Sequence, residues 1–453
     1  MNVVSFFAGC GGLDLGFEQA GFNVIWANEF DKNIHATYRY NHPNTILCGD
    51  NLYDVKLEDI PECDGFIGGP PCQSWSVGGK GMGLKDDRGK LFLYYVGIIK
   101  KKRPKFFVIE NVFGILTEKH LPVFLNFIDI LRESGYYVSY SLLNASDYKI
   151  PQDRRRVFIV GIRRDFNIKY SFPIPVLSDI TLRNAIGDLV YPPNYYGDGE
   201  KVREHQYIPN HDVYTGLFDS KFMARNRVRG WNELSFTIQA QERNCPLHPQ
   251  APKMRYVNSE KRIFEVGYEY LYRRLSVREC ARVQSFPDNF RFIYDDVKTG
   301  YKMVGNAVPP RLAKYIALSL KEVFSEAPCK NNVLVVYYKD RKQLEKCIEN
   351  GVFYVRVSVK NDVLSSSTIL PCYLMLIKGK SKYLYRIEKG TRPQFADKQT
   401  LSNMGFSPSH MYYWLIKIDR MIGDCPLYKP KWKNPRDRRP YFDCMDSQNI
   451  NLK

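Results

Sequence analysis

The first 165 residues alternate short apolar runs with amphipathic segments of helix length. We predict strands at the apolar runs Val3–Phe7, Val24–Ala27, Gly65–Gly68, Phe106–Glu110, Val138–Leu142 and Val157–Ile162. Helical segments lie between them, as at Asp31–Tyr40, Leu91–Lys101 and Leu121–Ser134. This alternation predicts an α/β fold with a largely parallel sheet and helices on both faces. Ligands of such sheets bind at the carboxyl ends of the strands, so the loops that follow strands are the candidate sites.

The alternation stops near residue 170, and the chain divides into four segments. Residues 1–169 form the α/β domain, and 170–272 are rich in proline, which predicts an irregular, mainly β or loop domain. Helical periodicity returns at Ser276–Gln284 and Leu312–Phe324, so 273–326 is a segment that returns to the first domain. Residues 327–453 form a C-terminal extension. Its strand-like runs predict a β-rich structure: Val333–Tyr338, Val352–Val359, Tyr373–Ile377 and Tyr412–Ile418.

The charge of the chain indicates its class of binding partner, and the cysteine content indicates its cellular compartment. The chain carries 66 Lys and Arg against 48 Asp and Glu, a net charge of +18. This excess favours a polyanionic partner, nucleic acid before membrane. Residues 331–453 alone carry 22 basic and 11 acidic side chains, so much of the excess belongs to the extension. No stretch approaches the roughly 20 apolar residues that span a bilayer. The eleven cysteines form no CxxC pair or Cys/His cluster, so we expect no metal, no disulfide framework and a reducing cytoplasm.

A glycine-rich turn follows the first predicted strand. Its residues are Phe7, Ala8, Gly9, Cys10, Gly11, Gly12 and Leu13. Glycines let backbone amides approach a ligand closely, and the N-terminus of the following helix favours a negative group. Glu29 follows the second strand, where an acid accepts hydrogen bonds from ribose hydroxyls, and Asp50 follows Ile46–Gly49 at the third strand end. The glycine spacing differs from GxGxxG, so we expect an adenosyl ligand without a pyrophosphate.

A candidate nucleophile follows the strand Gly65–Gly68. Two prolines, Pro70 and Pro71, precede Cys72 and restrict the backbone there. A loop of this kind can hold a reactive thiolate in one position. A lone cysteine is more often an inert buried residue. Here, however, Glu110 ends the next strand at the same edge, and the run Gln152–Arg156 brings guanidinium groups nearby. A neighbouring cation lowers the pKa of a thiol and raises its thiolate fraction.

These motifs resemble those of the bacterial DNA cytosine-5 methyltransferases, in that family's order, from Met1 to Phe324. Phe7–Gly12 resembles the first cofactor motif, and Gly69–Ser76 resembles the Pro-Cys motif. Glu110–Val112 matches the ENV motif, and Gln152, Arg154 and Arg156 match QxRxR. Further matches are Asp87–Phe92, Arg273–Glu279, Gln284–Pro287 and Gly305–Pro310, the last of which returns Asn306 and Ala307 to the cofactor pocket.

The resemblance implies a Rossmann-like methyltransferase sheet that binds S-adenosylmethionine, and an irregular domain that recognises the DNA target. Cys72 would add to carbon 6 of a cytosine flipped out of duplex DNA, and Glu110 would protonate ring nitrogen 3 as general acid. Arg154 and Arg156 would hold the exocyclic oxygen, a phosphate or the carboxyl partner. The methyl group would then pass to carbon 5.

The irregular domain contains alternating arginines, Arg225, Arg227 and Arg229, which would point the same way on an extended strand. Arginine can bind guanine bidentately in the major groove, although simple phosphate contacts remain the alternative. With Arg243, this stretch is similar to modification methylases that recognise GGCC, which predicts methylation of the inner cytosine.

The resemblance predicts a cytoplasmic bacterial enzyme that acts as a monomer, with a cognate restriction endonuclease acting separately. One alternative is a tRNA cytosine-5 methyltransferase, since a member with the same motifs acts on RNA. Another is a catalytically silent DNA-binding regulator. The extension has no counterpart in the shortest methylases. Its aromatic and basic residues fit either nucleic-acid contact or a small packing domain.

Overall fold

The 453-residue chain was studied as a computed structural model, which places two compact units. Unit 1 comprises Met1–Lys169 and Ser178–Lys321, and unit 2 comprises Tyr170–Leu177 and Glu322–Lys453. The structure describes residues 1–71, 87–166, 168–176, 178–189, 191–203 and 207–324. Beyond these it describes 332–337, 345, 347, 349–356, 373–378, 381–387, 394–403, 412–424 and 441–444.

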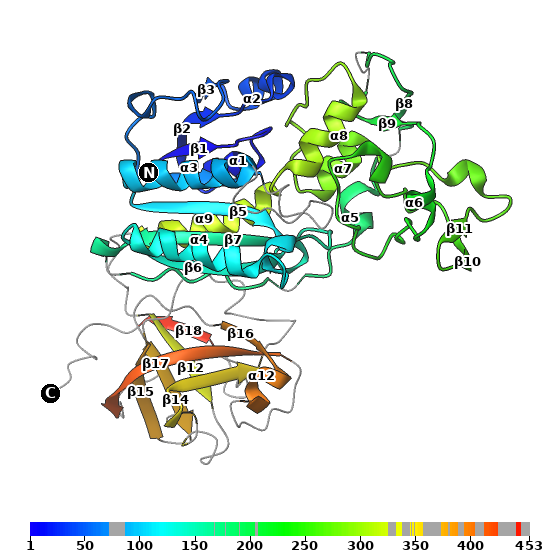
Figure 1. The fold of residues 1–453 in the computed structure, drawn as a ribbon. Coiled ribbons are helices and arrows are strands. Elements are labelled where there is room, and N and C mark those ends of the chain that lie inside the picture. The colour runs from blue at the N-terminus through cyan, green and yellow to red at the C-terminus, as the bar shows by residue number, and fades with distance from the viewer. Residues whose placement is uncertain are drawn as a thin grey trace. The chain divides into compact units, whose positions relative to one another are not determined.

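Unit 1 is built on a seven-stranded sheet (Figure 1). Its strands are β1 (Asn2–Phe6), β2 (Asn23–Asn28), β3 (Ile46–Cys48), β4 (Gly65–Gly68), β5 (Phe106–Val112), β6 (Tyr136–Asn144) and β7 (Arg155–Arg163). They lie in the order β3-β2-β1-β4-β5-β7-β6. The strand β7 runs antiparallel to both β5 and β6, and the other neighbouring strands pair in parallel. The predicted α/β fold with a largely parallel sheet is therefore confirmed.

Helices cover both faces of this sheet. The helices are α1 (Gly12–Gln19), α2 (His35–Asn41), α3 (Asp87–Lys102), α4 (Leu121–Glu133) and α9 (Pro310–Phe324). In Figure 1, α3 and α4 lie in front of the sheet and α9 lies behind it. Phe92 of α3 and Phe127 of α4 join strand residues such as Phe6 and Phe107 in one buried apolar core. On the other face α1 packs closely against α9. Gly16 lies so near Ala313 that an added Cβ would overlap the alanine side chain.

The remainder of unit 1 is irregular, as the prolines of its sequence predict. It contains two strand pairs, β8 (Asn194–Tyr196) with β9 (Asp212–Tyr214), and β10 (Arg255–Asn258) with β11 (Lys261–Ile263). Its helices are α5 (Leu182–Ile186), α6 (Ser220–Met223), α7 (Val277–Val283) and α8 (Val297–Asn306). A second buried core surrounds α7 and α8, with Cys280, Tyr301 and Val304 among its residues.

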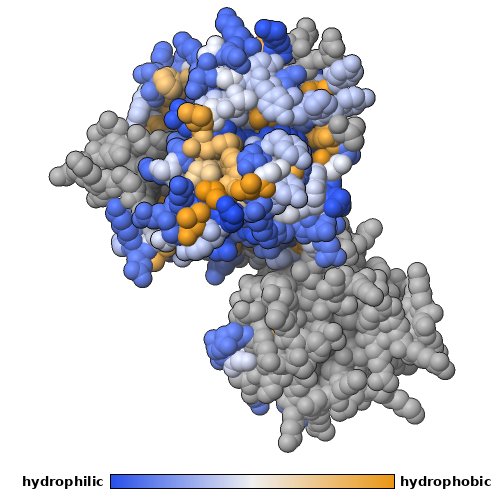
Figure 2. All heavy atoms as spheres, turned by 90° about the vertical axis from the view of Figure 1, so that its right-hand side faces the viewer, coloured by the Kyte–Doolittle hydropathy of each residue, from blue (hydrophilic) through white to orange (hydrophobic). Residues whose placement is uncertain are grey.

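Figure 2 shows apolar side chains gathered, within a hydrophilic rim, on the face of unit 1 that carries α6, β10 and β11. The exposed large apolar residues of this part of the chain include Leu217, Val266 and Tyr270. We refer to the whole irregular part, residues 178–306, as the recognition part.

Unit 2 is a second, mixed β structure. Its strands are β12 (Asn332–Tyr337), β13 (Val352–Arg356), β14 (Tyr373–Lys378), β15 (Ser381–Ile387), β16 (Gln394–Asp397), β17 (Tyr412–Asp424) and β18 (Tyr441–Cys444), with the helix α12 (Lys398–Asn403). The sheet order is β13-β17-β15-β14-β12-β18, and β16 pairs with β17. Four of these strands overlap the apolar runs of the sequence. Within the described residues of the whole chain, no helix is both long and apolar enough to cross a membrane.

Candidate active site

A cavity of about 560 Å³ opens where β1, β2, β4 and β5 end. The loops after these strands form its walls, together with the end of α8, so residues far apart in the sequence meet there. Nine of the fourteen catalytic and cofactor-binding residues predicted from the sequence line it: Phe7, Ala8, Gly9, Gly12, Leu13, Glu29, Glu110, Asn306 and Ala307. Gly11 and Asp50, although described, are not among the lining residues.

The glycine-rich turn joins β1 to α1 through three left-handed backbone positions. These are Phe7 (φ 54°), Gly9 (φ 58°) and Gly11 (φ 89°). Gly11 is the N-cap of α1, and no side chain caps this helix. The first N–H groups of a helix have no partner within the helix, so those of α1 can bind an acceptor in the cavity.

Glu29 is held rigidly beside this turn. One carboxylate oxygen accepts a hydrogen bond from the Gly9 N–H at 2.8 Å, and the other accepts one from the Asp31 N–H at 2.8 Å. Asp31 forms an ion pair at 2.7 Å with Lys302 of α8, and both residues line the cavity. Sequence analysis identified Glu29 but missed this ion pair, because 271 residues separate its two members.

The third strand end differs from the prediction. The Asp50 carbonyl accepts a hydrogen bond from the Asn28 amide at 2.9 Å, and its carboxylate lies 3.7 Å from Cys48 Sγ. The next two residues, Asn51 and Leu52, line the cavity instead. The prediction named the correct strand end, but the residues that line the cavity begin one position after Asp50.

Glu110, which lines the cavity, forms an ion pair with Arg156. Their Oε1 and Nε atoms are 3.0 Å apart, and the two side chains are 12% and 15% exposed. Burial raises the pKa of Glu110 despite the lowering effect of the nearby arginines. The second carboxylate oxygen faces Gly69, where an added Cβ would lie 3.3 Å from it. A buried carboxyl with a raised pKa is suited to donate a proton at neutral pH.

The loop that leads to the predicted nucleophile shares this wall. Gly69, Pro70 and Pro71 line the cavity, and the Asn111 amide donates to the Pro70 carbonyl at 3.4 Å. Cys72 itself lies outside the described residues. Asn111 was quoted from the sequence only as part of a motif, and its contact assigns it a role in holding this loop.

Arg154 does not have the surroundings that were expected for it. It is fully buried, and its guanidinium donates to the carbonyls of Ile238 (2.9 Å), Gly305 (3.0 Å) and Ala307 (2.9 Å). It does not line the cavity, so it cannot hold a substrate oxygen or phosphate there. Arg154 instead ties the start of β7 to the recognition part and to the end of α8. Only Arg156 reaches the carboxyl partner.

The four recognition arginines do not lie on one strand. The guanidinium of Arg227 donates to the Phe222 and Lys221 carbonyls, and that of Arg229 lies 4.2 Å from the centre of the Phe236 ring. The expectation that alternating arginines point the same way is therefore wrong, because backbone carbonyls and a ring hold two of them. Arg225 is exposed, and no described residue hydrogen-bonds with its guanidinium. Arg243 is also exposed and lies 3.7 Å from Glu242.

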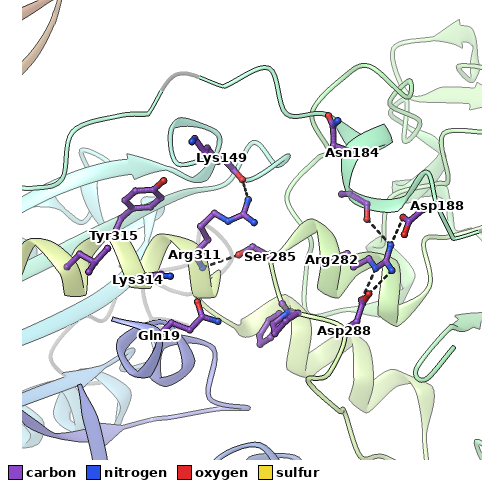
Figure 3. A pocket seen from close by; sticks show the side chains of 14 residues that line it. Gln19, Lys149, Asn184, Asp188, Arg282, Ser285, Asp288, Arg311, Lys314 and Tyr315 are labelled. Atoms are coloured by element: carbon purple, nitrogen blue, oxygen red, sulfur yellow. Dashed lines mark hydrogen bonds and ion pairs between the residues drawn. The ribbon is translucent and has the colours of Figure 1, made fainter. Parts of the chain in front are cut away.

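A second cavity, of about 660 Å³, lies between α9, the end of α1 and the loop after α7 (Figure 3). Arg282 is held there by Asp188 and Asp288, and the Arg311 guanidinium donates to the Lys149 carbonyl. None of the site residues predicted from the sequence lines this cavity. It belongs to the junction between the sheet and the recognition part.

The doubly wound sheet, its glycine turn and the shared cavity define a Rossmann-like methyltransferase. The family model for the C-5 cytosine-specific DNA methylases matches residues 1–322, so the chain belongs to this family and is a DNA cytosine-5 methyltransferase.

Curated relatives agree with this assignment. The type II methyltransferase M.MthTI of Methanothermobacter thermautotrophicus is 50% identical over 322 residues, which are 71% of this chain and 97% of that protein. M.NgoPII of Neisseria gonorrhoeae is 48% identical over 327 residues, 71% and 96% of the respective chains. Among solved structures, a DNA modification methyltransferase encoded within an E. coli prophage aligns at 25% identity and a TM-score of 0.56. The alignment covers 72% of this chain and 100% of the chain in that structure.

Proposed function

We propose that this enzyme methylates carbon 5 of a cytosine flipped out of duplex DNA, with S-adenosylmethionine as methyl donor. The observation that carries the proposal is that Glu110, held by Arg156, shares one cavity with the glycine turn and with the loop leading to Cys72. An adenosyl-binding turn and a proton-donating carboxyl are the two parts that this reaction needs close together.

The residues of the cavity fit S-adenosylmethionine. The uncapped N-terminus of α1 suits the carboxylate of the methionyl part, and Glu29 at the end of β2 suits the ribose hydroxyls. Phe7, Leu13 and Leu52 supply apolar walls for the adenine. When bound, the cofactor supplies an electrophilic methyl group.

The chain's own residues prepare the cytosine. The Cys72 thiolate adds to carbon 6, which makes carbon 5 nucleophilic, while Glu110 donates a proton to ring nitrogen 3. Arg156 keeps the Glu110 carboxyl oriented through their 3.0 Å contact. After methylation, loss of the carbon 5 proton expels the Cys72 thiolate and restores the aromatic ring.

The target atom is inaccessible inside a duplex, so the base must leave the stack at a cost of a few kcal/mol. The cavity lies between the sheet and the recognition part, since Lys302, Met303 and Asn306 of α8 complete its wall. A base extruded from DNA that contacts the recognition part would therefore enter beside Glu110.

We further propose that the target is GGCC, methylated at its inner cytosine, and that the enzyme serves a restriction–modification system whose endonuclease acts separately. Of the four arginines predicted from the sequence, Arg225 and Arg243 are the exposed ones, so we assign the guanine edges to them. The guanidinium groups of Arg227 and Arg229 are already engaged.

The test is tritium transfer from labelled S-adenosylmethionine to duplexes that contain GGCC, a permuted site, or no site, and to tRNA. We expect transfer to the GGCC duplex alone. Replacing Arg225 or Arg243 with methionine should cost about 1–3 kcal/mol each in kcat/KM for that duplex. Arg39→Met, which removes an exposed charge on α2, is the matched control. Equal transfer to the permuted duplex would contradict the GGCC assignment, and preferential transfer to tRNA would contradict the DNA target.

A further inference from the structure

Behind the glycine turn lies a buried cluster of polar side chains that the proposed reaction does not use. The Asp14 carboxyl accepts hydrogen bonds from Ser5 Oγ at 2.6 Å and from the Tyr38 hydroxyl at 2.5 Å. His42, the residue that ends α2, has a fully buried side chain. Its Nδ1 lies 3.0 Å from a carboxylate oxygen of Glu18 on α1. The cluster thus joins α2 to the helix that begins at the cofactor turn.

The second imidazole nitrogen of His42 faces the turn itself. An added Cβ on Gly11 would overlap His42 Nε2, so the ring lies directly against the Gly11 backbone. Nε2 is buried and has no hydrogen bond of good geometry to any described residue. The ring is held in this orientation by Tyr38, at 4.6 Å between ring centres, and by Phe290 at 6.2 Å.

The surroundings favour the protonated imidazole. Burial alone would lower the pKa of His42, but the hydrogen bond to Glu18 and the charge of Asp14 raise it above its ordinary value of 6.5. The Gly11 backbone acts in the same direction. In the protonated imidazole, Nδ1–H donates to Glu18 while Nε2 lies against the Gly11 backbone.

Gly11 is a position at which such support matters. It has a left-handed φ of 89° as the N-cap of α1, and no side chain caps the helix. Gly11 does not line the cavity, whereas its neighbours Cys10 and Gly12 do. A shift of Gly11 would therefore rotate the N–H groups that face the ligand.

We propose that His42 is a positioning residue for the cofactor turn: clamped by Glu18, its imidazole supports the Gly11 backbone from the side away from the cavity. The inference rests on the proposed binding of S-adenosylmethionine at this turn. It predicts that His42 acts on cofactor affinity and leaves the chemical step unchanged.

The experiment compares the full-length chain with His42→Phe and His42→Gln. Phenylalanine keeps the ring packing but removes both hydrogen-bonding nitrogens, and glutamine restores a group that can bond to Glu18. We expect His42→Phe to raise the KM and Kd for S-adenosylmethionine about tenfold. Its kcat at saturating cofactor and its KM for DNA should stay within about twofold. His42→Gln should recover part of the affinity.

Tyr136→Phe is the matched control. It removes one buried hydrogen bond, from the Tyr136 hydroxyl to the Pro104 carbonyl at 2.8 Å, at the edge of the sheet opposite the cavity. It should lower the melting temperature without changing the cofactor KM. If the wild-type chain binds no S-adenosylmethionine, the proposed function fails and this inference fails with it. If the wild-type chain binds it and both His42 variants bind equally well, only the inference is overturned.

Discussion

At the scale of single residues, Glu110 is the group on which the proposed chemistry depends most directly. Glu110→Gln should slow methyl transfer about 10²–10⁴-fold, because an amide cannot give a proton to nitrogen 3. The affinity for DNA should stay within about twofold, since the side chain keeps its shape. Single-turnover methyl transfer and a filter-binding assay measure the two quantities.

The pH profile gives a second measure of the same residue. Because burial raises the pKa of Glu110, wild-type activity should fall as the pH rises through that raised value and the proton is lost. The Glu110→Gln variant should not show this fall in activity. Glu118→Gln, the same change at an exposed site, should behave like the wild type. A Glu110→Gln rate within tenfold of wild type would remove Glu110 from the mechanism.

The position of a site residue could be predicted from the sequence where the end of a strand is enough to place its side chain. Glu110 lies near the carboxyl end of β5 and Glu29 follows β2, so counting along the strands placed both in the cavity. Arg154 was misassigned for the opposite reason. Its long side chain is directed by carbonyls 84 to 153 residues away, which no local pattern encodes.

At the scale of elements, α7 shows how the recognition part is fixed. Ser276 and Glu279 form a capping box at its N-terminus, and Glu279 also binds Arg273 through two contacts of 2.7 Å. Burial opposes ionisation, but Arg273 lowers the pKa of Glu279 from 4.5 to about 2. Burial lowers the pKa of the neighbouring His248 from 6.5 to about 4.

Acid should therefore loosen α7 in two stages. Both groups have depressed pKa values, so their stabilisation is complete above pH 6.5. The part due to His248 is lost between pH 6.5 and 4, and the part due to Glu279 below 4.5. Hydrogen exchange of the α7 amides at pH 7, 5 and 4 measures this change.

Glu279→Gln should speed that exchange at pH 7 and cost about 3–5 kcal/mol, because Arg273 is left buried without its partner. Glu260→Gln, on the exposed turn between β10 and β11, is the control. Exchange in α7 that stays equally slow in the Glu279 variant would show that the ion pair does not fix this helix.

The helix α8 was not predicted, and its glycines explain why. Gly300 and Gly305 interrupt its apolar pattern and lower its helical propensity. The structure needs both, because a Cβ on Gly305 would overlap the backbone at Gln239 and Ala240, and one on Gly300 would lie 2.7 Å from Tyr294. Close packing between distant segments thus removed the local signal of a helix that completes the active site.

At the scale of the whole molecule, unit 2 consists of the C-terminal part of the chain together with the short segment Tyr170–Leu177. Unit 1 ends at Lys321, its last buried apolar residue is Leu320, and the family match ends at residue 322. Deleting residues 327–453 should therefore leave the fold intact and methyl transfer within about threefold of wild type. Melting temperature and initial rates test this, and an unfolded product would show that unit 2 stabilises unit 1.

The same deletion measures what the charge of the extension does. It removes a segment with 23 basic and 11 acidic side chains, so we expect a shallower dependence of log K on log salt. Neutralising only Lys398, on α12, should have at most a small effect. An unchanged salt slope would exclude phosphate contacts by the extension.

The packing of α1 on α9 also constrains how the protein is made. Gly16 lies against Ala313, and these two residues are 297 positions apart. At roughly 5–20 residues per second, a ribosome needs about 15–60 s to synthesise the intervening chain. Until then α9 is missing from one face of the nascent sheet, and the entire recognition part emerges before that face is fully covered. The domain that holds the active site is therefore finished by one of its last helices, and its newly made chain depends on protection from aggregation during that interval.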